Sequence, residues 1–326
     1  MAHRRRVLAA ATATLVAPSL ALGQGAAPWR PNRPIGAIVP FSAGGPTDIL
    51  ARLLAEPVGA VLGQPLVVEN RTGAGGSIGA DLVAKSAPDG HTILVHDSGH
   101  AVAPALVARL PFDPVTDFAG IGVLVFAPLL LSVHPRVPAR TLPELIALLR
   151  ANPGRYNFAT TGIGGPGHIG GEIFRTAANV QIEMVHYRGG APAATAMASG
   201  EAQLTVLSIA ASLESIRAGT MRPIVMTVAQ RSALLPDVPT SAEAGLPGFV
   251  YENWRAALAP AATPPAVLAT LSDAFQAGLR HHRARLLEFA EEPRPGFATS
   301  AEVMAFVRGE AERNIAVLRA AGVRPE

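Results

Sequence analysis

The sequence of 326 residues contains no cysteine. Disulfide bonds, thiolate metal ligands and lipid attachment through a cysteine are therefore excluded for this chain. Lysine is almost absent as well, since Lys85 is the only one, and the arginines beyond the N-terminus are scattered. A protein that binds a row of phosphates needs clustered basic residues, so we expect no nucleic-acid partner.

The chain also lacks a broad excess of charge of one sign, although its formal net charge is +3. Lysine and arginine together number 27, against 24 for aspartate and glutamate, and the difference equals the three arginines at residues 4–6. The remainder of the chain is balanced. Composition therefore gives no reason to expect an acidic macromolecule as a partner.

The N-terminus has the pattern of an export signal. A basic stretch at residues 3–6 precedes an apolar stretch at 7–22, which ends in small residues. This pattern predicts a signal peptide over residues 1–23, cleaved near Gln24, and a periplasmic location. The apolar stretch is short for a membrane span and contains Pro18, so we expect no membrane anchor. The consecutive arginines also fit a twin-arginine signal, and both export routes stay open.

From residue 35 onward, short apolar strands, loops rich in glycine and amphipathic helices follow one another in a repeating order. This order favours parallel sheets flanked by helices. The predicted helices cover residues 48–62, 78–86, 142–150, 168–178 and 191–199, followed by two C-terminal helices packed on the first lobe. The predicted strands cover residues 35–39, 66–69, 92–96, 121–133, 156–159, 183–187, 203–207 and 223–227.

The length favours two domains over one compact core. We predict an α/β fold of two lobes, each a largely parallel sheet flanked by helices. Residues 24–127 and 230–326 form lobe I, residues 128–229 form lobe II, and the chain crosses between them near residues 128 and 229. Ligands bind at the carboxyl ends of the strands in open parallel sheets. The glycine-rich loops at those ends therefore predict a binding site between the lobes.

The loop at residues 40–48 leads from a predicted strand into a helix. Its glycines let the backbone N–H groups turn toward one point, and the helix dipole adds positive charge there, which suits an anion. Asp48 is expected at the N-cap or in the first turn, with Thr47 as a competing cap. A tight turn with a good cap explains the same residues equally well. The candidate ligand-binding residues here are Phe41, Ser42, Ala43, Gly44, Gly45, Thr47 and Asp48.

A second loop, at residues 162–167, matches the dinucleotide pattern G-x-G-x-x-G. Pro166 lies inside it, and the acidic residue expected at the end of the following strand is missing, so we expect no nucleotide and no other cofactor. The same loop works as a second group of polar donors. Its candidate ligand-binding residues are Thr160, Thr161, Gly164 and His168. Further along, Arg188 beside Gly189 can grip a carboxylate, or it forms a surface salt bridge.

Two other motifs favour enzymes. Residues 75–79 match G-x-S-x-G, with Ser77 as the nucleophile of an exported serine hydrolase. That motif needs a strand ending at the serine, whereas the predicted strand ends at Glu69, so we expect Ser77 to cap a helix. Residues 96–100 place two histidines and an aspartate together, but no fixed spacing supports a metal site. From this stretch Ser98 is a candidate ligand-binding residue.

Taken together, these stretches resemble one family, the substrate receptors of tripartite tricarboxylate transporters, also called the Bug or TctC family. The matching motifs follow in one order over nearly the whole chain after the signal peptide. They include Gly44-Gly45-Pro46-Thr47-Asp48, Gly73-Ala74-Gly75-Gly76-Ser77-Ile78-Gly79-Ala80, Pro88-Asp89-Gly90-His91-Thr92, Tyr187-Arg188-Gly189-Gly190 and Leu235-Pro236-Asp237-Val238-Pro239-Thr240.

The resemblance implies a type II periplasmic binding-protein fold that closes over a small carboxylate and catalyses nothing. The ligand class would be a di- or tricarboxylate, an acidic amino acid or an aromatic acid. Backbone amides and ordered waters in the loop at 40–48 would hold one carboxylate. The second lobe would contribute through residues 160–168 and through Tyr187, Arg188 and Gly189. A membrane permease would be the partner of a monomeric receptor, while a ligand sensor that feeds a signalling protein stays open.

Overall fold

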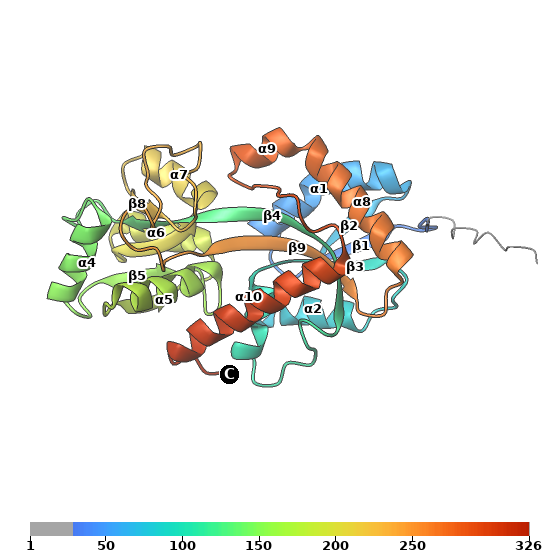
Figure 1. Ribbon diagram of the computed structural model, residues 1–326, viewed down its shortest axis with the longest axis horizontal. Coiled ribbons are helices and arrows are strands. Elements are labelled where there is room, and N and C mark those ends of the chain that lie inside the picture. Colours follow the sequence, from blue (N-terminus) through green and yellow to red (C-terminus); the bar gives the residue numbers. More distant parts are fainter. Residues whose placement is uncertain (1–28, 326) are drawn as a thin grey trace, which may run out of the picture.

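The computed structural model describes residues 29–325, so the predicted signal peptide and its cleavage site near Gln24 lie outside the described residues. Figure 1 shows two lobes joined by long strands. The strands are β1 (Ile35–Val39), β2 (Leu66–Asn70), β3 (Thr92–Asp97), β4 (Phe118–Val133), β5 (Asn157–Thr160), β6 (Glu183–His186), β7 (Leu204–Ser208), β8 (Arg222–Met226) and β9 (Glu252–Pro260).

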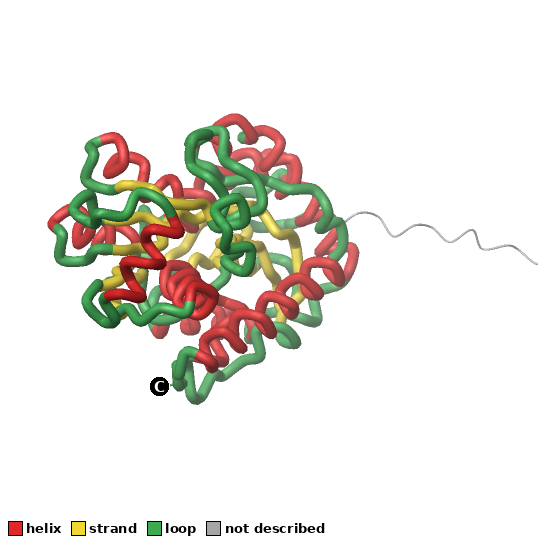
Figure 2. The backbone as a smooth tube through the Cα atoms, turned by 60° about the vertical axis from the view of Figure 1, so that its left-hand side comes forward, coloured by secondary structure: helices red, strands yellow, loops and turns green. Residues whose placement is uncertain are grey.

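Helices cover both lobes, and Figure 2 shows the strands in the interior with helices and loops around them. The helices are α1 (Pro46–Leu62), α2 (Ser77–Ala84), α3 (Gly99–Val102), α4 (Leu142–Ala151), α5 (Pro166–Ala178), α6 (Gly190–Ser199), α7 (Ile209–Arg217), α8 (Pro265–His281), α9 (Arg283–Glu288) and α10 (Ser300–Ala320), with 3-10 turns η1 (Ala74–Gly76) and η2 (Ala103–Ala105). The predicted α/β fold with two lobes is confirmed.

Each lobe contains a group of parallel strands, and the loops that follow these strands therefore lie at the same edge of the sheet. In the first lobe β1 pairs in parallel with β2 and β3, and in the second lobe β5 pairs in parallel with β6 and β7. The antiparallel strands β9 and β4 lie between these two parts in the order β2-β1-β3-β9-β4-β7-β5-β6. The two sets of candidate loops therefore belong to different lobes of one mixed sheet.

Strand β4 belongs to both lobes. All its residues are buried. Up to Pro128 it pairs with β9, and from Leu129 it pairs with β7 and β8. The change of partner lies at the predicted first crossing near residue 128. The exact lobe boundaries stay predictions, and the packing of Val238 and Phe249 with second-lobe side chains favours a second crossing within β9 rather than at 229.

The core of the first lobe explains the position of α1. Its buried leucines and valine recur every four residues at Leu50, Leu54, Val58 and Leu62, and this stripe packs between the sheet and α8. The α1 helix begins at Pro46, two residues before the predicted start, because proline suits the first helical position, which needs no N–H partner.

Several elements differ from the sequence prediction. Helix α7 and strand β9 were not predicted, and the C-terminus holds three helices instead of two. Helix α10 does not pack on the first lobe alone, since Val303 and Val307 lie in a first-lobe cluster and Leu318 lies in the second-lobe core. Figure 1 shows α10 running beneath β4 and β9 from one lobe toward the other.

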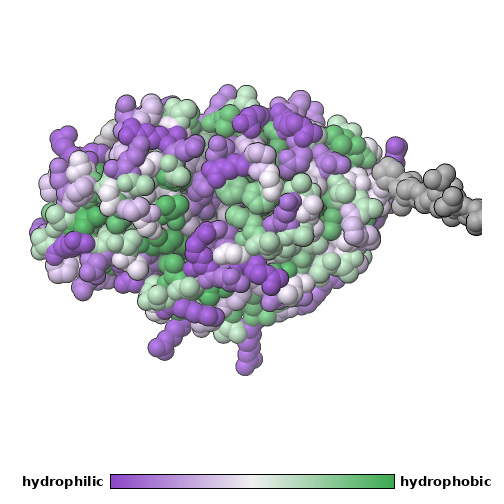
Figure 3. Space-filling view, in the orientation of Figure 1, coloured by the Kyte–Doolittle hydropathy of each residue, from purple (hydrophilic) through white to green (hydrophobic). Residues whose placement is uncertain are grey.

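Figure 3 shows hydrophilic and hydrophobic residues interspersed over the face that carries α10. Within residues 29–325 no helix combines the length and the apolar character needed to cross a bilayer.

Candidate functional site

The first candidate loop connects β1 to α1. Gly44 has a left-handed backbone with φ of 79°, and the extended Gly45 is the N-cap before Pro46. No side chain caps this helix, so Thr47 is not the cap and Asp48 lies in the first turn. The first N–H groups of α1 are therefore left to another acceptor, at the partly positive end of the helix dipole. We call residues 42–48 the first glycine turn.

Asp48 fixes the shape of this turn. Its carboxylate is 1% exposed and accepts hydrogen bonds from the N–H of Gly44 at 2.8 Å, from Arg52 at 2.9 Å and from Asn70 at 2.9 Å. Burial raises the pKa of Asp48, but the hydrogen bonds from Arg52, Gly44 and Asn70 outweigh it and hold the pKa below its ordinary value. The side chain is thus an anchor for the backbone, and its oxygens are already occupied.

The loop between β5 and α5 repeats this geometry. Gly164 is left-handed with φ of 71°, Gly165 is the extended N-cap without a side chain, and Pro166 follows. The Gly165 N–H donates to the carbonyl oxygen of Gly162 at 3.0 Å, and the Gly45 N–H donates to Ser42 in the same way at 3.2 Å. We call residues 162–168 the second glycine turn. The two lobes carry two copies of one turn.

His168 takes the place of Asp48 in the second glycine turn. Its Nδ1 accepts the N–H of Gly164 at 3.0 Å. The pKa of His168 is lowered to about 4, mainly because the ring is buried and also because His186 and Arg175 lie nearby. The ring is therefore neutral near pH 7 and can accept this bond. The second turn is therefore anchored by a neutral group, whereas the first is anchored by a carboxylate.

The two predicted threonines support the second turn from inside. Thr160 is fully buried and its hydroxyl lies 2.8 Å from Nδ1 of His186. The Thr161 hydroxyl accepts the N–H of Gly167 at 3.0 Å. Both hydroxyls are engaged within the protein, so these residues shape the turn.

The third candidate loop follows β6. Gly189, with φ of 113°, is the N-cap of α6, and no side chain caps that helix either. The Tyr187 hydroxyl donates to Glu201 at 2.8 Å, and burial together with this carboxylate raises the pKa of Tyr187 to about 12. The side chain of Arg188 is exposed and forms no ion pair within residues 29–325. Of the three residues, Arg188 offers an uncommitted charge beside an uncapped helix end.

The second glycine turn closely approaches Leu106. A Cβ atom built on Gly164 would lie only 1.9 Å from Cδ1 of Leu106, which follows η2 and packs against the core cluster of the second lobe. Leu106 was not among the residues predicted from the sequence. The same contact could have been suspected from Gly164 alone, because a glycine without a side chain permits close approach. The predicted residues otherwise form two sets, one on each lobe.

Ser98 directly follows β3 and is buried. Its side chain is 0% exposed, and its hydroxyl contacts Asn253 at 2.8 Å and the Tyr251 hydroxyl at 3.0 Å. It thereby ties the end of β3 to the chain entering β9. A role of Ser98 in ligand binding stays a prediction.

The motifs that favoured enzymes take other roles. Gly76 is the N-cap of α2 and Ser77 its first residue, so the prediction that Ser77 caps the helix was wrong by one position. Six residues separate the end of β2 from Ser77, which gives no strand-to-serine elbow. Within the described residues, no three histidine, aspartate or glutamate side chains come together as metal ligands would.

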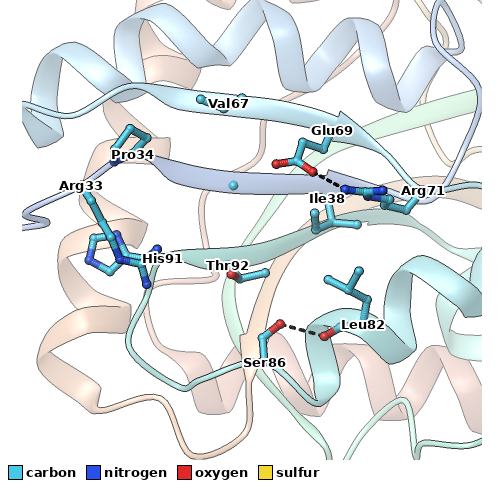
Figure 4. A pocket seen from close by; sticks show the side chains of 11 residues that line it. Arg33, Pro34, Ile38, Val67, Glu69, Arg71, Leu82, Ser86, His91 and Thr92 are labelled. Carbon is cyan, nitrogen blue, oxygen red and sulfur yellow. Dashed lines mark hydrogen bonds and ion pairs between the residues drawn. The ribbon is translucent and has the colours of Figure 1, made fainter.

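A hollow of about 340 Å³ lies elsewhere in the first lobe, on the face of β1, β2 and β3 beside α2 (Figure 4). Arg33 and His91 lie at one end of it, and the ion pair of Glu69 with Arg71 lies at the other. The Arg33 side chain is itself paired with Asp89. This hollow contains none of the candidate residues, so it is separate from the glycine turns.

Replacing Asp48 by alanine should lower the free energy of unfolding by about 1–3 kcal/mol, because buried donors lose their acceptor. The folded pKa of Asp48 is lowered, so this contribution is complete above the unfolded pKa near 3.8 and is lost as the pH falls below it. Urea unfolding at pH 7 and pH 3 tests this. The difference between wild type and Asp48→Ala should shrink at pH 3, and Asp48→Asn, which keeps one acceptor oxygen, should lose less. An equal difference at both pH values would contradict the assignment.

Comparisons with known proteins agree with this geometry. Residues 50–323 match the model of the tripartite tricarboxylate transporter family receptor. Protein BugT of Bordetella pertussis is 36% identical over 296 residues, which is 90% of this chain and 91% of that protein. The structure of R. palustris Rpa4515 with adipate superposes with a TM-score of 0.81 at 34% identity, over 91% of this chain and 99% of that one. The structure of MatC from Rhodopseudomonas palustris with bound malate superposes with a TM-score of 0.79 at 33% identity, over 88% of this chain and 99% of that one. This chain therefore belongs to the tripartite tricarboxylate transporter receptor family of solute-binding proteins.

Proposed function

We propose that the protein is a periplasmic receptor that captures a small carboxylate between its lobes and passes it to the permease of a tripartite tricarboxylate transporter. The observation that carries this proposal is the duplication of the glycine turn. Each lobe presents one helix N-terminus preceded by a left-handed and an extended glycine; that of α1 is uncapped, while at that of α5 the Thr161 hydroxyl accepts the Gly167 N–H. Such ends bind anions through backbone N–H groups and the helix dipole.

The charges around the turns suit a carboxylate. The negative charge of Asp48 is paired with Arg52, and His168 is neutral near pH 7. Arg188, which forms no ion pair with the described residues, adds a guanidinium next to the uncapped N-terminus of α6. Closure of the lobes would bring groups from both sides onto one ligand and exclude water from it. The adipate and malate in the related structures favour a small di-acid as the ligand of this chain.

A screen of carboxylic acids by thermal melting tests the proposal. A ligand at a hundred times its dissociation constant should stabilise the protein by about 2.7 kcal/mol. The panel should contain malate, adipate, citrate, glutamate and benzoate. If no acid changes the melting temperature, the receptor proposal fails.

Two variants separate binding from the competing serine chemistry. Gly45→Val should abolish the melting shift, because even a Cβ atom there lies 3.2 Å from the Ser42 carbonyl oxygen and the larger side chain covers the first turn of α1. Ser77→Ala should leave the shift unchanged. Loss of a hydrolytic activity in Ser77→Ala would instead support the hydrolase. The permease partner, the monomeric state and export with cleavage near Gln24 remain part of the proposal.

A further inference from the structure

His96 lies next to the first glycine turn and has no role in the description above. It is the penultimate residue of β3, and its side chain is 2% exposed. The edge of its ring meets the ring of Phe41, with centroids 5.0 Å apart at 79°. A Cβ atom on Gly76 would lie 2.7 Å from Nε2. The imidazole therefore sits at the carboxyl edge of the sheet, between the loops that follow β1 and β2.

The shortest hydrogen bond of His96 favours one tautomer. The backbone N–H of Asp97 donates to Nδ1 at 2.8 Å, which places the lone pair on this nitrogen. The Asp97 carbonyl oxygen and carboxylate lie farther from Nδ1, at 3.1 and 3.4 Å, and the carboxylate accepts the Gly99 N–H at 2.9 Å. In the neutral ring that accepts the bond from Asp97, the proton lies on Nε2, and His96 is a donor on that side.

The donor is held rigidly and has no protein acceptor. The ring of His100 packs on His96 at 5.2 Å, and His100 is itself held by a bond of 2.9 Å from its Nε2 to the Pro114 carbonyl oxygen. Within residues 29–325 Nε2 of His96 has no hydrogen-bond partner, yet it is not one of the fully buried polar atoms that lack a partner, so another molecule can reach it. An accessible N–H without an acceptor in the protein gains a hydrogen bond when a ligand supplies the acceptor.

We propose that His96 is a specificity-determining residue whose Nε2–H binds a second oxygen acceptor of the solute. This inference rests on the proposed function. One carboxylate lies on the glycine turns, and the other oxygen, from a second carboxylate or a keto group, reaches the base of the first lobe beside Phe41. His96 thereby selects solutes with two acceptor groups over monocarboxylates of the same length.

The test compares acids that differ in one carboxylate. Isothermal titration calorimetry should measure succinate against butyrate, glutarate against pentanoate, and adipate against hexanoate. Wild type should prefer the di-acid in at least one pair. His96→Ala should weaken that di-acid about 10- to 100-fold, as expected for a hydrogen bond to a charged group. The same variant should change the affinity for the matched monocarboxylate less than about twofold.

Two controls keep the outcome interpretable. His96→Gln retains a donor and more of the side-chain volume, so it should recover part of the preference even if the alanine variant is poorly folded. His91→Ala removes another buried histidine of the first lobe, away from the glycine turns, and should leave the preference intact. If His96→Ala weakens the di-acid and the monocarboxylate equally, so that the ratio of their affinities is unchanged, the role of His96 is overturned. If the wild-type protein binds the monocarboxylate as tightly as the di-acid in every pair, the role of His96 is overturned but the receptor proposal stands. If the wild-type protein binds no acid at all, both proposals fail.

Discussion

Gly164→Val should abolish ligand binding, with a loss of at least about 100-fold in affinity, while the fold survives. The substitution strains a left-handed backbone at a cost of about 1–3 kcal/mol, which a protein of ordinary stability tolerates. The new side chain also collides with Leu106, since its Cβ would lie 1.9 Å from one methyl group. The second glycine turn must then shift, and the surface that it presents to the ligand moves with it.

A matched control is available at Gly219. Its φ of 70° is nearly the same as at Gly164, but no atom lies within 4 Å of a Cβ placed there. Gly219→Val should therefore lose similar stability and keep its affinity, measured by calorimetry with the tightest acid of the panel. Adding Leu106→Ala to Gly164→Val should recover part of the binding. Undiminished affinity in Gly164→Val would remove the second glycine turn from the site.

Glu291→Ala should be the most destabilising single change, lowering the free energy of unfolding by about 3–5 kcal/mol. Glu291 is the ion-pair partner of Arg255, whose side chain on β9 is only 3% exposed. Without the carboxylate, a buried guanidinium is left unpaired, and its Nε already has no partner within the described residues. Urea unfolding monitored by circular dichroism measures the effect.

The neighbouring pair of Arg285 and Glu288 provides the comparison. Both of its side chains are more than half exposed, so Glu288→Ala should cost less than about 1 kcal/mol. Replacing both buried partners, as in Arg255→Met with Glu291→Leu, should restore most of the stability, because no charge then remains buried. A Glu291→Ala variant as stable as Glu288→Ala would show that water or another group neutralises Arg255.

The regular elements were predictable where a repeating local pattern determines them. Strand β1 was predicted with its observed ends. The starts of α1 and α5 were predicted two residues too late, because each helix begins at a proline. Strand β9 could not be recognised in the same way. It includes the polar residues Glu252, Asn253 and Arg255, and they are held inside the sheet by β3, β4 and Glu291, far away in the sequence.

The site was predictable at the level of the loops but not of the side chains. Glycine followed by glycine and proline marks both turns, and the repeat of Gly-Gly-Pro with Asp48 or His168 two residues later is a signal that could have identified the anchors. The partners of Ser98 could not be predicted from the sequence. Ser98 follows a strand end as a ligand-binding residue would, and its partners Tyr251 and Asn253 are more than 150 residues away.

Strand β4 makes the two halves of this receptor inseparable as building blocks. Its first part completes the sheet of one half, and its last five residues complete the sheet of the other. Any attempt to excise one half, or to graft it onto a different binding protein, leaves the remaining half with a bare hydrophobic edge. New specificities in this scaffold are therefore more easily obtained by changing loops at strand ends than by exchanging whole halves.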